Sequence, residues 1–214
     1  AIIFFFFSLS SCNQQKCPDI LPVVQLRGQV LALSNDSLVF GALVQALDVN
    51  GAPVGETGVT DTNGNYSLDI PEFVDENGAV VDNAFTLRVQ AQTFQEFPTD
   101  IRPALPISTT DAVEETIQVE AKMECPATIF AIENALTTVK LIALPGDTSA
   151  LGSISGTVFD ENHKGHLVVA EGAPGTFTGY SDAVGKYTIF NVPAGAYVVN
   201  AYVLGAQFVP ANTT

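Results

Sequence analysis

The stretch Thr60-Asp61-Thr62-Asn63-Gly64-Asn65-Tyr66-Ser67-Leu68 recurs in altered form as Ser181-Asp182-Ala183-Val184-Gly185-Lys186-Tyr187-Thr188-Ile189. In each copy an Asp can accept hydrogen bonds from the backbone that follows it, and a Gly three residues later tolerates a positive φ. Apolar and polar residues alternate directly after the first turn, which is typical of a strand with one buried face. We therefore predict a β-hairpin with a half-buried return strand in each copy. The structural turn residues are Asp61, Gly64 and Tyr66 in the first copy and Asp182, Gly185 and Tyr187 in the second.

A duplicated stretch in a chain of 214 residues favours two small domains over one large domain. Hydrophobic residues make up 47% of the chain and charged residues 14%, so the composition allows a core and is not that of a disordered chain. The net charge of −15 and the 8 scattered Lys and Arg residues argue against nucleic acid as a partner. They also argue against direct adsorption to anionic lipid heads.

Alternation and turn signals predict an all-β chain with a first module over residues 23–122 and a second over residues 152–214. Strands of the first module are expected at 23–31, 41–47, 65–70, 85–91 and 115–121. Gly156-Thr157-Val158 echoes Gly28-Gln29-Val30 near the start of each module. Asn50-Gly51 and Pro193-Ala194-Gly195 predict further hairpin turns.

Residues 123–151 are expected to connect the two modules. Within them, Ile129, Ile132, Leu136, Val139 and Ala143 fall on one face of a helix, which predicts a short helix over residues 126–143. Several Thr and Val residues lower the helix propensity of this segment, so a strand is the alternative.

The first nine residues are almost all apolar but too few to span a bilayer as a helix, which needs about 20 residues. Residues 1–11 are interpreted as a truncated signal peptide. The sequence Leu9-Ser10-Ser11-Cys12 resembles the bacterial lipobox, in which the Cys is diacylated. Each buried CH₂ of an acyl chain contributes about 0.8 kcal/mol, so several chains on one residue anchor strongly. We therefore predict lipidation of Cys12, a tether over residues 12–22 and a location in the cell envelope, at the outer membrane or cell surface. A conventional secretory signal that contains a Cys is the alternative.

Two further cysteines, Cys17 and Cys125, remain once Cys12 is assigned to lipid. An exported protein lies in an oxidising compartment, so a disulfide between them would tie the tether to the segment between the modules. Two unpaired thiols are the alternative. Two isolated Cys residues do not make a metal site.

The repeat resembles the carboxypeptidase regulatory-like domain, a prealbumin-like β-sandwich related to the collagen-adhesin B-type repeat. The resemblance rests on Gly-x-Val, Thr/Ser-Asp-x-x-Gly-x-Tyr and Val-Pro-x-Gly-x-Tyr, and the second module carries all three at 156–158, 181–187 and 192–197. The first module carries two of them, because an insertion follows Ile70-Pro71. The resemblance implies two tandem prealbumin-like or Ig-like β-sandwich modules, in which the rings of Tyr66 and Tyr187 point inward and their hydroxyls reach the rim. It also implies a closing strand after the last Tyr, and the sequence ends at Asn212-Thr213-Thr214, so we expect the second module to be truncated or to borrow that strand.

No catalytic constellation is evident in the sequence, and we predict no enzyme, no cofactor and no metal site. His163 and His166 lie in a polar segment that we interpret as a solvated turn, although two His near carboxylates could hold Zn²⁺. The set Asp61, Asn63, Asn65 and Asp69 has oxygen ligands, but the Gly and the closing Glu of a calcium loop are missing from their places. Lys122 is the one Lys that could form an isopeptide crosslink in the first module.

The expected function is that of a non-catalytic envelope lipoprotein, held to the membrane by its N-terminal lipid, whose modules act as stalk, spacer or adhesion and binding domains. The alternative is a carbohydrate-binding accessory module of a larger envelope protein or enzyme. Sugar platforms favour exposed aromatic rings, and the chain has no Trp. Tyr180, Tyr202 and Phe208 are the candidates for that role, although packing is the simpler explanation for each.

Overall fold

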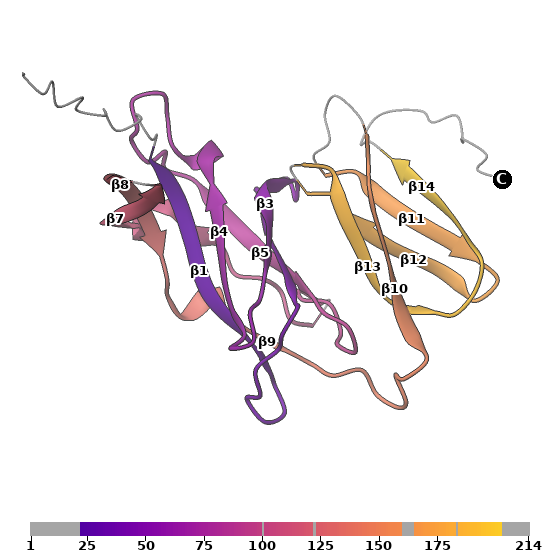
Figure 1. Cartoon of the computed structure of the whole chain (residues 1–214). Helices are drawn as coiled ribbons and strands as arrows, with labels where there is room; N and C mark the ends of the chain where they lie inside the picture. Colours follow the sequence, from indigo (N-terminus) through magenta and orange to yellow (C-terminus); the bar gives the residue numbers. More distant parts are fainter. Residues whose placement is uncertain (1–21, 100, 122, 160–164, 183, 203–214) are drawn as a thin grey trace, which may run out of the picture.

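A computed structural model describes residues 22–99, 101–121, 123–159, 165–182 and 184–202, with the backbone alone given for residues 119–121 and 123–125. The described chain is built from strands, joined by three short 3₁₀ helices. The strands form two separate pairs of sheets, so the expected all-β class with β-sandwich modules is confirmed. Figure 1 shows the two sandwiches side by side, and we call them the first and second units.

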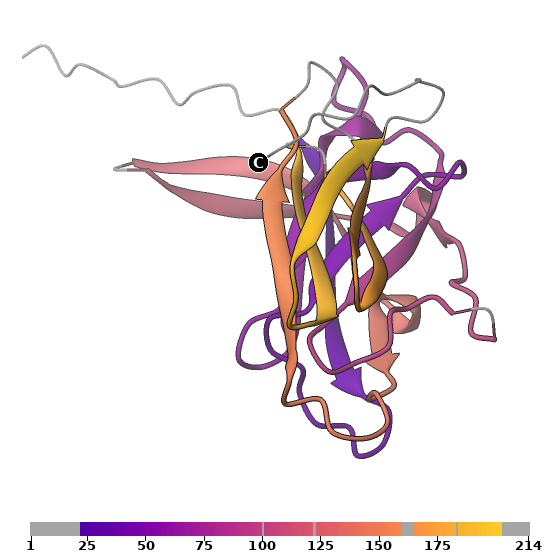
Figure 2. The same cartoon turned by 90° about the vertical axis from the view of Figure 1, so that its right-hand side faces the viewer.

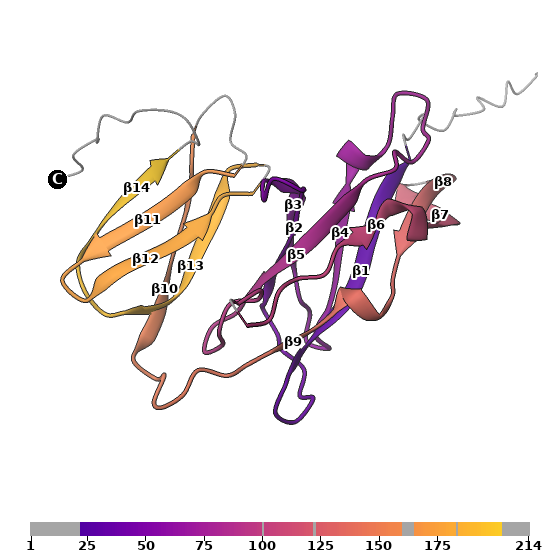
Figure 3. The same cartoon turned by 180° about the vertical axis from the view of Figure 1, so that it is seen from behind.

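Among the residues described, the first unit has nine strands in two sheets (Figures 1 and 3). One sheet has the order β4-β1-β8-β7, with β9 also paired to β1, and the other has the order β3-β2-β5-β6. The strands are β1 (Val23–Ala32), β2 (Leu43–Leu47), β3 (Pro53–Val59), β4 (Asn65–Ile70), β5 (Ala84–Gln90), β6 (Ile107–Ser108), β7 (Val113–Ala121), β8 (Met123–Ile132) and β9 (Thr138–Leu141). The 3₁₀ helices are η1 (Pro71–Phe73), η2 (Thr109–Asp111) and η3 (Ala135–Thr137).

Alternation along the strands produces the core between these two sheets. In β4 and β5 every second residue is buried, as the sequence pattern predicted. Leu26, Ile70, Phe85 and Ile132 are among the side chains that are almost fully buried there. At about 25 cal/mol per Å² of apolar surface removed from water, this core is the main source of stability of the first unit.

The described part of the second unit contains five strands in two sheets. They are β10 (Leu151–Thr157), β11 (Leu167–Gly172), β12 (Gly175–Tyr180), β13 (Lys186–Pro193) and β14 (Tyr197–Tyr202). β10 pairs with β13, and the other sheet has the order β12-β11-β14. The core is small and centres on Val168, Ala170, Ile189 and Val192.

The two units share one pattern of strand pairing. In the first, β1 pairs with β4 and β2 pairs with both β3 and β5; in the second, β10 pairs with β13 and β11 pairs with both β12 and β14. All of these pairs are antiparallel. The register also agrees, because Gly28 lies opposite Tyr66 and Gly156 lies opposite Tyr187. The sequence repeat therefore corresponds to a repeated five-strand arrangement.

The hairpins predicted at the two Asp turns are wrong. β3 and β4 flank the first turn but pair with β2 and β1 respectively, so the chain crosses from one sheet to the other at this turn. β12 and β13 flank the second turn and belong to different sheets in the same way. The turn at 193–195 also joins strands of different sheets. The hairpin predicted at Asn50-Gly51 is present, because β2 pairs with β3.

The helix predicted over residues 126–143 is also wrong, and the alternative interpretation as strand is correct. β8 and β9 pair in parallel with β1, and only Ala135–Thr137 forms a 3₁₀ turn between them. Pairing with β1 buries Ile129, Ile132 and Val139, whereas Leu136 remains 38% exposed. Residues expected in the connection thus complete a sheet of the first unit, and the described part of the second unit has no counterpart of β8 or β9.

Candidate functional site

The two Asp turns have matching hydrogen bonds. The Asp61 Oδ1 atom accepts from the backbone N–H groups of Asn63 (2.8 Å) and Asn65 (2.9 Å). The Asp182 Oδ1 atom accepts in the same way from Val184 (3.0 Å) and Lys186 (2.8 Å). Each turn therefore satisfies its backbone donors with its own carboxylate, as expected for Asp at the start of a tight turn.

The Gly of each turn has a left-handed backbone, with φ of 69° at Gly64 and 82° at Gly185. The carbonyl of each Gly accepts a hydrogen bond of 2.8 Å, from Val30 on β1 in the first unit and from Val158, directly after the end of β10, in the second. A side chain other than hydrogen would be strained at this φ. This hydrogen bond thus joins each turn to the segment, β1 or the end of β10, that pairs with the strand following the turn.

Each turn is followed by a Tyr whose ring lies against a Gly on the neighbouring strand. A methyl group at Gly28 would come 2.7 Å from the Tyr66 hydroxyl, and one at Gly156 would come 2.5 Å from the Tyr187 hydroxyl. Tyr66 is 4% exposed and its hydroxyl donates to the Thr137 carbonyl at 2.8 Å. The expectation that this hydroxyl reaches the rim is therefore wrong. Burial raises the pKa of Tyr66 strongly, and burial also raises the pKa of the half-buried Tyr187.

The second unit is joined to the first through Asn191. Its Oδ1 atom accepts from the Thr93 N–H at 2.7 Å, and its Nδ2 group donates to the carbonyls of Phe94 (2.8 Å) and Ala91 (3.3 Å). Gln92 of the same turn donates from Nε2 to the Leu151 carbonyl at 2.9 Å. The Asn191 side chain on β13 thus makes hydrogen bonds to three backbone groups of the turn at 91–94, which follows β5.

Arg88 makes a further contact between the units. Its guanidinium carbon lies 3.9 Å from the centre of the Tyr180 ring, and its Nε donates to Glu96 Oε1 at 3.1 Å. Glu96 also accepts from Gln90 Nε2 at 2.9 Å, so one carboxylate orients both side chains. The Arg88 side chain is only 13% exposed, and its buried Nη1 atom has no hydrogen-bond partner. A stacked cation that is partly removed from water in this way can stabilise the joint by about 1–2 kcal/mol.

Two hollows lie beside this joint, in the region where Figure 1 shows β3 and β13 facing each other. The smaller has a volume of about 180 Å³ and lies between the outer face of the β3-β2-β5 sheet and the second unit, with Gln45, Tyr180 and Tyr187 in its wall. The larger has a volume of about 630 Å³ and lies along the β3 and β4 edges, with Ser67 and Asp69 in its wall. Glu56 and Thr57 line both hollows, so the two are adjacent, and we call them together the groove along the boundary between the units.

The structure brings some of the sequence-predicted residues together at the joint and leaves others apart. Asp182, Tyr187 and Tyr180 line the smaller hollow, whereas Asp61, Gly64 and Tyr66 belong to the corresponding turn inside the first unit. Tyr202 lies at the end of β14 and is 36% exposed. His166 is 2% exposed, so the expectation of a solvated turn is wrong at this residue. Its backbone N–H donates to Ser181 Oγ at 2.9 Å, the place that Ala42 and Thr60 take in the first unit.

Several predicted residues cannot be compared with the structure. Cys12, Cys17, Lys122, His163 and Phe208 lie outside the described residues, as does the side chain of Cys125. Within the residues that are described, no group of three or more His, Cys, Asp and Glu side chains is placed to hold a metal ion. In the same part of the chain, no helix has the length and apolar character needed to cross a membrane.

The residues that form the joint were missed in the sequence. Asn191 lies 97 to 100 positions away from the residues that it contacts, so no local pattern identifies it. The one available signal is its residue type, because Asn tolerates the φ of 61° that it adopts better than most residues do. Arg88 follows the normal polar alternation of β5, and nothing in the sequence distinguishes it from the neighbouring Thr86 and Gln90.

Comparisons with known proteins add little to this picture. No family model matches the sequence, and no curated protein matches it. A solved structure described as the Bacillus anthracis TIE protein is similar at 13% sequence identity with a TM-score of 0.31. The similarity covers 85% of this chain and 28% of that chain, so the chain spans less than a third of the length of this neighbour.

Proposed function

We propose that this chain is a non-catalytic lipoprotein of the cell envelope, whose two β-sandwich units act as a surface spacer or binding stalk. The observation that supports a spacer is the joint at Asn191. Three hydrogen bonds from one side chain, together with the stacking of Arg88 on Tyr180, hold the second unit against the first. A fixed joint keeps the far end of the second unit at a constant distance from the first unit, which a flexible linker does not.

The finer family assignment is part of the same proposal. The matching turns, the Tyr-on-Gly contacts and the shared strand pairing support two repeats of the carboxypeptidase regulatory-like, prealbumin-like type. Domains of this kind are accessory β-sandwiches, so the resemblance supports a structural or binding role and no peptidase activity.

Anchoring is tested through Cys12. We expect cells that express the protein behind a complete bacterial leader to incorporate a clickable palmitate analogue into it and to retain it in the membrane fraction. Cys12→Ala removes both the label and the membrane retention, while the matched variant Cys17→Ala keeps both. Equal labelling of the wild type and of Cys12→Ala contradicts the anchor at this residue.

Carbohydrate binding is the second candidate function, and the groove along the joint is the observation that favours it. Its smaller hollow combines the rings of Tyr180 and Tyr187 with the amides of Gln45 and Gln90 and the hydroxyl of Thr57. Amide and hydroxyl groups both donate and accept hydrogen bonds, as sugar hydroxyls require. Glu56, Asp69 and Glu72 line the larger hollow, so a neutral sugar is favoured over an anionic one.

An array of neutral and uronic-acid oligosaccharides tests this candidate. We expect binding to neutral oligosaccharides that is weakened about tenfold or more by Gln45→Met and by Thr57→Val, both of which keep the shape of the wall. The control Gln118→Met changes the same chemical group on the exposed face of β7. Absence of binding, or binding that both wall variants leave intact, excludes the groove as a sugar site.

A further inference from the structure

The β7–β8 hairpin extends beyond the sheet that carries it. The two strands pair at every position from Val113–Ala131 to Ala121–Met123, whereas β1 meets β8 only at Ile129–Ile132. Residues 116–121 and 123–128 therefore form a two-stranded ribbon, which we call the arm. At about 3.3 Å per residue it is about 20 Å long. Figure 2 shows the arm projecting from the first unit.

The outer edge of β7 has no neighbouring strand among the described residues, because β7 ends the sheet order β4-β1-β8-β7. Such an edge presents backbone N–H and C=O groups that another extended chain can pair with. A ribbon of only two strands is marginally stable in water, and it gains stability when a third strand is added. The arm thus has an unpaired strand edge, and the addition of a further strand to this edge would stabilise it.

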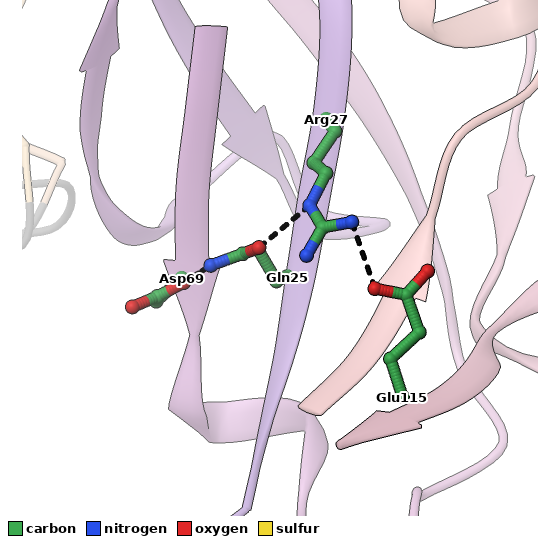
Figure 4. A network of polar contacts seen from close by, with 4 residues as sticks. All are labelled: Gln25, Arg27, Asp69 and Glu115. Atoms are coloured by element: carbon green, nitrogen blue, oxygen red, sulfur yellow. Dashed lines mark hydrogen bonds and ion pairs between the residues drawn. The ribbon is translucent and has the colours of Figure 1, made fainter. Parts of the chain in front are cut away.

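The two faces of β7 differ, which restricts what can cover it. Val113 and Ile117 lie on one face, and Glu114, Thr116 and Gln118 are exposed on the other. Glu115 lies on the apolar face, where it pairs with Arg27 at 2.9 Å (Figure 4). Arg27 in turn donates to Gln25, which donates to Asp69, so this carboxylate belongs to a network on the sheet. Glu114 is not part of that network.

The charge of the β7–β8 hairpin indicates which kind of strand can add to the edge of β7. The hairpin sequence contains Glu114, Glu115, Glu120 and Glu124 against one Lys122. A second copy of the chain would bring the same excess of carboxylates to this edge, and like charges close to each other destabilise a sheet. We propose that the open edge of β7 binds an extended polypeptide segment with alternating basic and apolar residues, which adds as a further strand. Its basic residues lie beside Glu114, and its apolar residues lie beside Val113 and Ile117. This inference is independent of the proposed anchor and spacer.

The probe is an eight-residue synthetic peptide of alternating Lys and Val with blocked ends, compared with a Glu–Val peptide of the same pattern. We expect the Lys–Val peptide to bind and to slow hydrogen exchange at alternate amides of residues 113–118. Blocking its backbone donors by N-methylation on one edge should abolish this protection. Glu114→Lys should weaken binding about fivefold, whereas the matched change Glu171→Lys on β11 leaves binding unchanged.

Three results overturn the inference. The first is no binding of the Lys–Val peptide at millimolar concentration. The second is equal binding of the Glu–Val or the N-methylated peptide, which would mean that attraction occurs without strand pairing. The third is sedimentation that reveals a dimer of the protein with the same amides protected, because the edge is then covered by a second copy.

Discussion

The ring of Tyr187 lies across Gly156 on the paired strand, and a methyl group at Gly156 would stand 2.5 Å from the Tyr187 hydroxyl. Tyr66 and Gly28 have the same relationship in the first unit, but there the methyl group would also stand 2.0 Å from the Thr137 carbonyl oxygen. The half-buried Tyr187 ring can move outward, whereas the Thr137 backbone is held in the turn between β8 and β9. Gly→Ala substitutions should therefore have unequal costs in the two units.

Gly28→Ala should lower the free energy of unfolding by about 3 kcal/mol, and Gly156→Ala by about 1 kcal/mol, as expected for overpacking against rigid and movable neighbours. Urea unfolding monitored for each unit measures both values. Gly152→Ala is the control on β10, because its methyl group would meet its nearest neighbour at an ordinary 3.8 Å. Equal effects of all three changes would contradict the Tyr-on-Gly contact.

Tyr66→Phe should cost about 1–3 kcal/mol, because it leaves the buried Thr137 carbonyl without its donor. Tyr187→Phe, at the corresponding half-buried position of the second unit, is the control. An equal stability of the two variants speaks against a buried hydrogen bond at Tyr66.

Stability should also depend on alkaline pH through the same residue. Burial raises the pKa of Tyr66 in the folded state above the value of about 10 in the unfolded chain. The contribution of its neutral form is therefore complete below about pH 10 and is lost as the pH rises further, by up to about 1.4 kcal/mol per pH unit. Tyr66→Phe should make the decline between pH 10 and 11.5 shallower than in the wild type. A decline of unchanged slope would assign it to other groups.

Asp182→Ala should destabilise the second unit by about 1–2 kcal/mol, because two backbone N–H groups lose a charged acceptor that is 3% exposed. Asp182→Asn should restore most of this loss, since the amide oxygen can still accept. Asp82→Ala, at an exposed carboxylate outside the turns, should change stability little. If Asn rescues no better than Ala, the turn is not held by this oxygen.

The sequence was informative about turns and faces and uninformative about partners. Asp61 with Gly64, and Asp182 with Gly185, carry their turn chemistry within a few residues, and the alternation of β4 identifies its buried face. Neither signal says which strand lies beside β4, because a turn of the same local geometry can close a hairpin or cross between sheets. The two hairpin predictions therefore failed while the strand that follows the first turn was correct.

The segment 126–143 shows a related limit. Its apolar spacing fits a helix, yet the segment forms the two strands β8 and β9 beside β1. Pairing with β1 satisfies the backbone hydrogen-bonding groups and buries Ile129 and Val139. The contacts that join the two units could not be predicted from the sequence at all. Asn191 and Arg88 acquire their roles only when residues about 100 positions apart are brought together.

We infer that Asn191 holds the two β-sandwich units in a single relative position. Spin labels attached through non-natural amino acids at Thr138 on β9 and Thr176 on β12 allow the distance between the units to be measured by pulsed electron paramagnetic resonance. We predict one narrow distribution in the wild type and a much broader one in Asn191→Gly, which keeps the backbone φ but removes all three hydrogen bonds. A distribution that is already broad in the wild type, or one that Asn191→Gly leaves narrow, would contradict the account.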